Sequence, residues 1–401
     1  MRVLQLCHKP PYPAVDGGCL AMGAITEGLL SQKHEVKILT IVTSKHPFLK
    51  DQIPADIIQY SKLEAIMIDT NPNPIDALKT SLFNQSYNVT RFDSQVFHKR
   101  LKQILEGDNF DIVHLESLFM TPYVPTIRKY STAKIVMRSH NVEHQLWLEK
   151  SKNEANILKK IYFKHLASSL KKYEIRHLNN YDGLITISNL DQTIFNKSGC
   201  SIPQITIPFA PLNIEKHEKK AHIGNKSIFF IGSFDWQPNL EGILWFAEKI
   251  WPHILIAFPN LELIIAGRKT PQSIKKLDQT LNITVAGEVK NAQDFMNDND
   301  IMIVPLLSGS GLRIKVIEAM ALGIPIISTQ KGAEGIDYKD GKHLMVANSV
   351  EEFIIAFNDL IASEIKRKEI SQNAFELVER NYNNENNTNK LVSFYQQLLQ
   401  S

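Results

Sequence analysis

The feature that most constrains the fold is a repeated alternation between short apolar runs and longer segments with apolar residues at helical spacing. Strands that alternate with helices are joined by crossover connections, and such strands lie parallel in one sheet. The pattern therefore predicts an α/β fold with two Rossmann-like, doubly wound parallel-sheet domains. The predicted strands are 3–7, 35–42, 66–68, 110–115, 134–138 and 183–188, and then 228–231, 261–266, 283–285, 301–304 and 325–328.

The predicted domains are separated by a polar stretch without periodicity. Pro208 and Pro211 frame a turn there, and charged residues follow at 215–220. We expect a first domain at 1–208, a linker at 209–226, a second domain at 227–380 and a C-terminal helix at 381–401 that packs back on the first domain. Ligands bind at the carboxyl ends of the strands of open α/β sheets, so we expect the two domains to face each other across a binding cleft. The predicted helices include 95–107, 153–180, 313–322, 350–362 and 386–399.

Composition excludes several classes of protein. The net charge of +3 over 401 residues gives no reason to expect nucleic-acid binding. The three cysteines, Cys7, Cys19 and Cys200, form no zinc-ligand pattern and suggest a reducing compartment. No apolar run is long enough for a signal peptide or a membrane span. We therefore expect a cytoplasmic protein, or one peripheral to the inner face of the cell membrane.

The most informative segment runs from Pro305 to Pro325 and reads as a strand end, a Gly/Ser loop and a helix. Backbone N–H groups in such a loop and at a helix N-terminus bind phosphate. Arg313 and Lys315 add two cations at the helix start, where basic residues oppose the helix dipole unless an anion is bound. Glu318 lies further along this otherwise apolar helix and suits a pair of sugar hydroxyls. The alternative is a plain strand–helix turn with charges that face solvent.

This segment resembles the donor-binding segment of retaining glycosyltransferases of the GT-B fold, family four, also called group 1 glycosyltransferases. The resemblance covers essentially the whole chain, and the subgroup is one with a Gly-Ser-Gly-x-Arg-x-Lys donor loop. It implies that Glu318 binds the ribose hydroxyls of the donor nucleotide. The first glutamate of the family's Glu-x7-Glu pattern falls at Ser310, so backbone amides at Ser310, Gly311 and Leu312 are expected to bind the donor instead.

The second domain departs from many relatives in one further place. The loop 235–239, Asp-Trp-Gln-Pro-Asn, lacks the Arg and Lys that hold the diphosphate in those relatives. We infer that Arg313 and Lys315 meet the phosphate charge, with Arg268 as a further candidate and Asn239 as a donor-binding residue. Arg268 is equally consistent with a solvated loop cation. The resemblance also implies that backbone groups from Gly287 to Val289 contact the nucleobase.

The first domain offers fewer candidates. Gly17 and Gly18 follow the first strand without a Gly-x-Gly-x-x-Gly fingerprint, which argues against an NAD or FAD enzyme. The resemblance implies that this Gly-Gly loop approaches the donor phosphates and that His140 contacts the donor sugar near the transferred carbon. Glu143 is a weaker candidate, and His114 and Glu116 are weaker still. The alternative for residues 139–143 is a helix cap built on Ser139 or Asn141.

Residues 150–177 carry eight Lys or Arg and two Glu side chains among apolar residues. Such a helix either lies on an anionic membrane or packs on the sheet with its charges in solvent. Residues 71–93 are irregular and polar, and they are a candidate wall for the acceptor.

Together these features predict an enzyme that transfers a sugar, with retention, from a UDP- or GDP-linked donor to a glycan or lipid-linked acceptor. We expect neither a cofactor nor a metal ion, because the nucleotide sugar is a co-substrate and no Asp-x-Asp follows a strand. The family's usual setting is bacterial surface polysaccharide or lipopolysaccharide synthesis. Two alternatives remain at this point: a sugar-nucleotide isomerase of the 2-epimerase kind on the same fold, and a nucleotide-sugar binding protein without catalysis.

Overall fold

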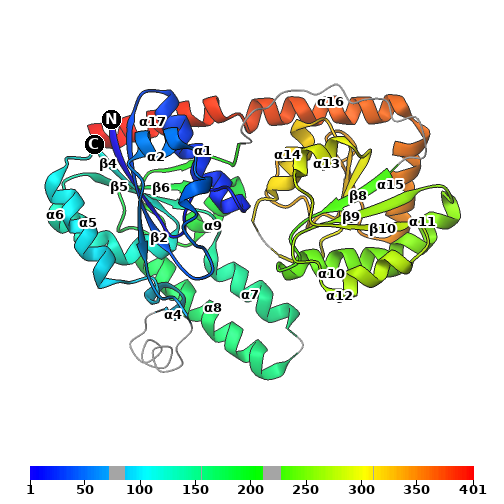
Figure 1. Cartoon of the computed structure of the whole chain (residues 1–401), viewed down its shortest axis with the longest axis horizontal. Coiled ribbons are helices and arrows are strands. Elements are labelled where there is room, and N and C mark those ends of the chain that lie inside the picture. Colours follow the sequence, from blue (N-terminus) through cyan, green and yellow to red (C-terminus); the bar gives the residue numbers. More distant parts are fainter. Residues whose placement is uncertain (72–85, 155, 211–226, 310) are drawn as a thin grey trace. The chain divides into compact units, whose positions relative to one another are not determined.

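The computed structural model describes residues 1–71, 86–154, 156–210, 227–309 and 311–401. The chain divides into two compact units (Figure 1). The first comprises Met1–Ala210 together with Asn384–Ser401, and the second comprises Pro211–Asn383. Most of the expected linker, 211–226, lies outside the described residues.

The first unit is built on a parallel sheet, as predicted. Its described strands follow the order β3-β2-β1-β4-β5-β6-β7, so the strand order reverses direction between β1 and β4. All neighbours pair in parallel. The strands are β1 (Arg2–Cys7), β2 (Glu35–Val42), β3 (Glu64–Met67), β4 (Ile112–Glu116), β5 (Lys134–Ser139), β6 (Gly183–Thr186) and β7 (Gln204–Thr206).

Helices cover both faces of this sheet, and two separate apolar clusters form the cores beneath them. The C-terminal helix α17 (Asn384–Gln400) packs on the first unit, as predicted, with Leu391, Phe394 and Leu398 buried beside strand residues such as Val3. Gly28 in α1 lets α17 approach closely, because a Cβ atom there would collide with Thr388. The other helices of this unit are α1 (Gly17–Ser31), α2 (Ala55–Ser61), α4 (Tyr87–Thr90), α5 (Gln95–Gly107), α6 (Val124–Tyr130), α7 (Glu143–Asn153), α8 (Ile157–His177) and α9 (Asn189–Lys197).

The helix predicted at 153–180 is α8, and it forms a hairpin with α7 at 143–153, a helix that was not predicted. These helices pack along each other and extend away from the sheet of the first unit (Figure 1). The prediction missed α7 because its sequence is mostly polar. Trp147 of α7 meets Phe163 of α8 at a ring-centroid distance of 5.7 Å, which fixes the pairing of the two helices.

The second unit repeats the plan with a smaller parallel sheet, ordered β10-β9-β8-β11-β12-β13 among the described residues. Here the order reverses between β8 and β11. The strands are β8 (Ser227–Ile231), β9 (Glu262–Ala266), β10 (Ile283–Gly287), β11 (Ile301–Val304), β12 (Ile326–Ser328) and β13 (Met345–Val346). The helices are α10 (Gln237–Trp245), α11 (Trp251–Ala257), α12 (Gln272–Lys275), α13 (Ala292–Asn297), α14 (Ile314–Ala321), α15 (Val350–Ala362) and α16 (Glu364–Asn381).

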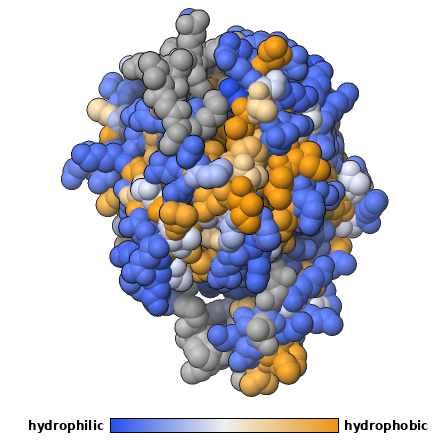
Figure 2. Space-filling view, turned by 90° about the vertical axis from the view of Figure 1, so that its right-hand side faces the viewer, coloured by the Kyte–Doolittle hydropathy of each residue, from blue (hydrophilic) through white to orange (hydrophobic). Residues whose placement is uncertain are grey.

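The core of the second unit is rich in aromatic side chains. Phe246 and Phe353 meet edge to face at 5.3 Å, and Trp251 is fully buried beside them. On the outside, α11 and α15 pack together and leave Ile256 and Ile355 exposed. Figure 2 views this side of the molecule and shows apolar side chains gathered on it.

Candidate functional site

The predicted site residues follow the carboxyl ends of strands in both units. In the first unit, His8 and Glu116 stand at the ends of β1 and β4, where the strand order reverses. In the second unit, the loops that begin at Gly232 and Pro305 follow β8 and β11, at the corresponding reversal. Open α/β sheets bind ligands at this point, because the connections on either side leave in opposite directions.

The loop between β11 and α14 is held by glycines and by a buried threonine. Gly309 and Gly311 have φ angles of +95° and +87°, which side chains other than glycine rarely adopt. Gly309 also packs against Trp236, so that a Cβ atom would lie 2.8 Å from the indole. Thr329, after β12, donates its hydroxyl to the carbonyl of Leu306 at 2.5 Å. Ser310 lies outside the described residues.

Arg313 occupies the N-cap position of α14, and it is 9% exposed. Its guanidinium stacks on Trp236 at 4.8 Å and donates to the carbonyl of Gly311 at 2.8 Å. Burial lowers the pKa of Arg313 to about 10, while Glu334 opposes this shift. The side chain therefore stays charged near neutral pH, in a place where an anionic ligand would offset its desolvation.

Lys315 and Glu318 are joined by an ion pair of 2.8 Å within the first turns of α14. Glu318 is buried, whereas the Lys315 side chain is 39% exposed. The structure thus brings the three residues predicted from this helix to one end of it. It also couples the cation expected to bind phosphate to the carboxylate expected to bind ribose, which the sequence did not reveal.

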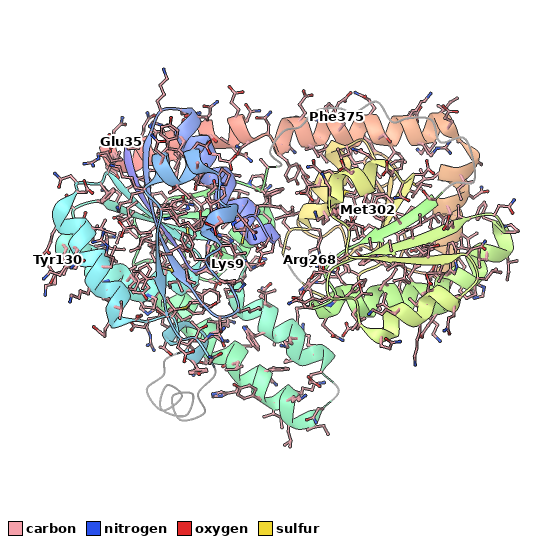
Figure 3. The ribbon with its side chains drawn as sticks, in the orientation of Figure 1. Lys9, Glu35, Tyr130, Arg268, Met302 and Phe375 are labelled. Atoms are coloured by element: carbon pink, nitrogen blue, oxygen red, sulfur yellow. The ribbon has the colours of Figure 1, made fainter. Side chains whose placement is uncertain are left out.

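The other predicted residues of the second unit include Asn239, in the first turn of α10, and Arg268, in the loop after β9. Asn239 donates its side-chain amide to the carbonyl of Ser233 at 2.9 Å and so closes the loop after β8. Arg268 follows β9 (Figure 3); its side chain is exposed, and its carbonyl accepts from Phe234 N at 3.0 Å.

The expected nucleobase contact begins at Gly287, which has a φ of +70° at the end of β10. Its carbonyl accepts from the N–H of Gly267 at 2.7 Å, which ties this strand end to the loop after β9. Val289 and Leu312 are half-buried.

A cavity of about 440 Å³ lies beyond the ends of β12 and β13. Its lining includes Lys331 and Glu334, which pair at 2.7 Å, and the carboxylate of Glu334 is close enough to influence Arg313. Sequence analysis missed these two residues. One signal was present in the sequence, because Gly332 stands between them, just after the predicted strand 325–328. The structure shows why glycine is needed there: a Cβ atom would lie 2.5 Å from the carbonyl of Val304.

In the first unit, Gly17 and Gly18 form the first turn of α1 rather than a loop before it, which corrects the prediction. Asp16 caps this helix by accepting from Cys19 N at 2.9 Å, and it pairs with Lys9 at 2.6 Å. Burial would raise the pKa of Asp16, but the ion pair with Lys9 outweighs it and lowers the pKa. A Cβ atom on Gly18 would lie 2.9 Å from the Lys9 amine, so the glycine leaves room for that cation.

His140 is joined to the weaker candidates His114 and Glu116 in one buried network. Glu116 accepts from His140 Nε2 at 2.6 Å, and His114 Nε2 lies 3.2 Å from its other oxygen. Burial would raise the pKa of Glu116, but Arg138 and His114 outweigh this and hold it well below the usual value. Burial lowers the pKa of His140, and it lowers that of the neighbouring His8 to about 3.

Glu143 begins α7 and is almost completely buried. The alternative for this segment, a helix cap on Ser139 or Asn141, is not found, because Val142 occupies the N-cap position and Glu174 of α8 accepts from the N–H groups of Glu143 and His144. Burial, and then the charge of Glu174, raise the pKa of Glu143 to about 8. Glu143 therefore carries a proton at neutral pH.

The described residues contain no group of three or more His, Cys, Asp or Glu side chains placed to hold one metal ion. None of the described helices has the length and apolar composition required to cross a bilayer.

The fold and the placement of these residues define a two-unit α/β protein with polar and charged groups at the strand ends where such folds bind ligands. Residues 225–363 match the family model described as glycosyl transferases group 1. That match, together with the fold, supports a group 1 glycosyltransferase.

The chain is 28% identical over 399 residues to an uncharacterized 44.6 kDa protein in the cps region of Klebsiella pneumoniae, covering 95% of this chain and 96% of that protein. It is 25% identical over 161 residues to the phosphatidyl-myo-inositol mannosyltransferase of Mycobacterium leprae, covering 39% of this chain and 42% of that enzyme. The second of these likenesses is to a glycosyltransferase, in agreement with the family model.

Solved structures share the whole architecture. A sucrose-phosphate synthase from Thermosynechococcus elongatus superposes with a TM-score of 0.72 at 15% identity, covering 99% of both chains. The Anabaena protein HepE, solved in complex with UDP-glucose, superposes with a TM-score of 0.66 at 12% identity, covering 99% of this chain and 100% of that one. These likenesses establish the GT-B fold of the chain.

Proposed function

We propose that this chain is a retaining, metal-independent glycosyltransferase that moves a sugar from a UDP- or GDP-linked donor to a glycan or lipid-linked acceptor. The observation that carries the proposal is the start of α14. There a glycine loop, a buried arginine and an ion-paired lysine and glutamate meet at one helix N-terminus. Such an N-terminus binds a diphosphate through its N–H groups, and the glutamate can accept from ribose hydroxyls.

In this proposal the two cations have different roles. Arg313 is fixed by Trp236 and by the Gly311 carbonyl, so it offers a preorganised charge to the diphosphate. Lys315 is more exposed and can turn from Glu318 towards the phosphate whose negative charge grows as the sugar leaves. The leaving phosphate oxygen then takes the acceptor proton, so transfer needs no second carboxylate as a nucleophile.

Metal independence is proposed because these cations can supply the charge that a metal supplies elsewhere. The sequence Asp298-Asn299-Asp300 lies before β11, at the amino end of the sheet, where Asp300 accepts from Ser227 N at 3.0 Å. It therefore stands at the wrong edge of the sheet to hold a metal at the donor loop.

The proposal is tested by incubating the full chain with UDP- and GDP-sugars, with and without a lipid-linked glycan acceptor, and measuring release of the nucleoside diphosphate. We expect release that depends on the acceptor and persists with a metal chelator, and an anomeric proton signal that shows retention. Conversion of the sugar nucleotide without acceptor would identify an isomerase. Binding without release with any acceptor would identify a sensor.

The same proposal includes a contact between the α7–α8 hairpin and an anionic membrane, where a lipid-linked acceptor would lie. The first turns of α8 expose Ile157, Leu158 and Ile161 at 72%, 78% and 62%. Lys159, Lys160 and Lys164 lie among them. Apolar side chains flanked by cations are the composition that binds anionic bilayer surfaces.

Sedimentation with vesicles tests this contact. We expect the chain to bind vesicles that contain phosphatidylglycerol and to bind phosphatidylcholine vesicles poorly. Ile161→Glu should reduce binding about tenfold, by analogy with the cost of placing a charge in apolar surroundings. Ile355→Glu is the matched control, because Ile355 of α15 is as exposed as Ile161. This variant should have no effect on vesicle binding. Equal loss in both variants would contradict a role for the hairpin.

A further inference from the structure

The carboxylate of Glu116 is surrounded by hydrogen-bond donors and has no exposed surface. Its Oε1 atom accepts from Gln5 Nε2 at 2.8 Å and lies 3.2 Å from His114 Nε2. Its Oε2 atom accepts from His140 Nε2 at 2.6 Å and from the Arg138 guanidinium at 3.4 Å. The donors come from three neighbouring strands and from the turn after one of them.

The donors around this carboxylate determine where the imidazole protons lie. An arginine can only donate, and Gln5 uses its carbonyl to accept from Thr26 at 2.7 Å, so its amide must donate to Glu116. Glu116 is therefore an ionised acceptor, in agreement with its lowered pKa. An ionised carboxylate can only accept, so the ring nitrogen of His140 that faces it must carry a hydrogen.

A neutral imidazole has one N–H group, and the other nitrogen then accepts. Burial lowers the pKa of His140, which favours the neutral ring. With the hydrogen on Nε2, the lone pair lies on Nδ1. Within the described part of the chain Nδ1 has no hydrogen-bond partner, and 13% of the His140 side chain is exposed.

His114 provides an internal comparison in the same network. Its Nε2 atom also faces Glu116, and its Nδ1 atom lies 2.5 Å from the hydroxyl of Tyr395 in α17. Both histidines thus place Nε2 beside one carboxylate; the His140 contact is a hydrogen bond, whereas His114 Nε2 makes none with the described residues. Nδ1 of His114 contacts a hydroxyl group of the protein. Nδ1 of His140 has no such partner among the described residues and can accept from a ligand.

We propose that Glu116 is a positioning residue that fixes His140 as a neutral imidazole protonated at Nε2, so that Nδ1 accepts a hydrogen bond from a hydroxyl of the donor sugar. The identity of that hydroxyl-bearing ligand rests on the proposed function. The arrangement resembles the way in which a buried carboxylate fixes the tautomer of a catalytic histidine in other enzymes.

The first experiment needs no ligand. The chain is labelled with ¹⁵N-histidine, and the two ring nitrogens of His140 are assigned by comparison with His140→Gln. We expect the chemical shifts of a neutral ring protonated at Nε2 at pH 7.5. A ring protonated at Nδ1, or at both nitrogens, would overturn the proposal. Tyr395→Phe is the matched control, because it should alter the His114 signals and leave those of His140 unchanged.

The second experiment removes the carboxylate without leaving a buried charge unpaired. The double variant Glu116→Leu/Arg138→Met replaces the pair by apolar side chains of similar size, a change that buried ion pairs often tolerate. We expect a mixed tautomer at His140 and about tenfold weaker binding of UDP-glucose, or of GDP-mannose if that is the donor bound. Binding of UDP or GDP, which lack the sugar, should change less than twofold.

The outcomes separate the two proposals. In the His140→Gln background the double variant should weaken sugar-nucleotide binding less than twofold, because its effect passes through His140. An equal loss for the sugar nucleotide and the free diphosphate would indicate a general structural role and contradict the proposal.

If no sugar nucleotide binds the unaltered chain, the proposed function fails, whereas the ring spectrum still decides the role of Glu116. If the double variant does not fold, the spectrum of the unaltered chain is the deciding test.

Discussion

The two units present their candidate residues in opposite ways. In the first unit, Glu116 is completely buried and accepts short hydrogen bonds from Gln5 and His140. In the second unit, Arg313 and Lys315 stand at the start of one helix, and their contacts are a ring face, a carbonyl and a neighbouring carboxylate. In the first arrangement the carboxylate is satisfied by protein donors without a ligand. The second concentrates positive charge that an anion would stabilise.

This difference indicates which part of a ligand each unit is suited to bind. A buried network of hydrogen bonds can orient a neutral group, such as a sugar hydroxyl, through one atom that the network leaves without a partner, here Nδ1 of His140. A helix N-terminus with added cations binds charge, such as a diphosphate. Substitutions in the second unit should therefore affect turnover and donor affinity most, and substitutions around the first network should affect orientation or stability.

The largest effect is expected for Lys315→Met, which keeps the aliphatic stem and removes the charge. Loss of one preorganised charge at the departing phosphate should lower kcat about 100-fold. Steady-state assays of nucleoside diphosphate release measure it. Lys269→Met is the control, because Lys269 is 70% exposed and forms its ion pair with the surface residue Asp235. Rates within twofold of the unaltered chain would remove Lys315 from the mechanism.

A pH-dependent change in stability is expected for Glu143→Gln. The pKa of Glu143 is raised to about 8 in the folded chain from an ordinary value of about 4.5. Its contribution to stability is therefore fully present below pH 4.5 and is lost as the pH rises through about 8. The uncharged glutamine avoids this loss, so the variant should gain about 2.5 kcal/mol over the unaltered chain between pH 5 and pH 7, and more by pH 9.

Urea unfolding at pH 5, 7 and 9 measures this gain in free energy of unfolding. Glu106→Gln, at a side chain that is 50% exposed, is measured in parallel and should show no such trend. A difference between Glu143→Gln and the unaltered chain that does not vary with pH would show that Glu143 is not buried in its neutral form.

An intermediate effect on affinity is expected for Glu318→Gln. Hydrogen bonds from the ribose hydroxyls to a charged carboxylate stabilise binding by about 1.5 kcal/mol more than hydrogen bonds to a neutral amide. The KM for the donor should therefore rise about tenfold in this variant. Because the ribose is bound equally before and during transfer, kcat should change less than threefold. Glu369→Gln on the exposed surface of α16 is the control. A fall in kcat with an unchanged KM would instead place Glu318 among the groups that act on the transferred sugar.

The smallest effect is expected for Gly309→Ala. The added methyl group meets Trp236 at 2.8 Å, and the φ of +95° is unfavourable for alanine. We expect a loss of about 1 kcal/mol in the free energy of unfolding. Gly107→Ala, at a helix end with no atom within 4 Å of the added carbon, should be neutral or slightly stabilising. Equal effects in the two variants would show that the donor loop is not held in this conformation.

The sequence predicted the parallel sheets because each strand is a local apolar run, as in Ile301–Val304. It did not predict β13, which has two residues, or α7, whose polar sequence hides its packing on α8. The donor loop was visible because its glycines and cations lie within a dozen residues. The Glu116 network was hardly visible, because it joins residues as distant as Gln5, Arg138 and Tyr395. Local spacing carries no information on contacts of that kind.

The placement of α17 has a consequence for the synthesis of the chain. The last helix completes the core beneath the first sheet, and Tyr395 reaches His114 within it. A ribosome makes residues 1–210 before α17, yet these residues lack part of their interior until α17 has been synthesised. The N-terminal unit should therefore remain incomplete throughout synthesis of the second, and a chain that ends before residue 384 should expose Val3 and Met22 to water and to proteases.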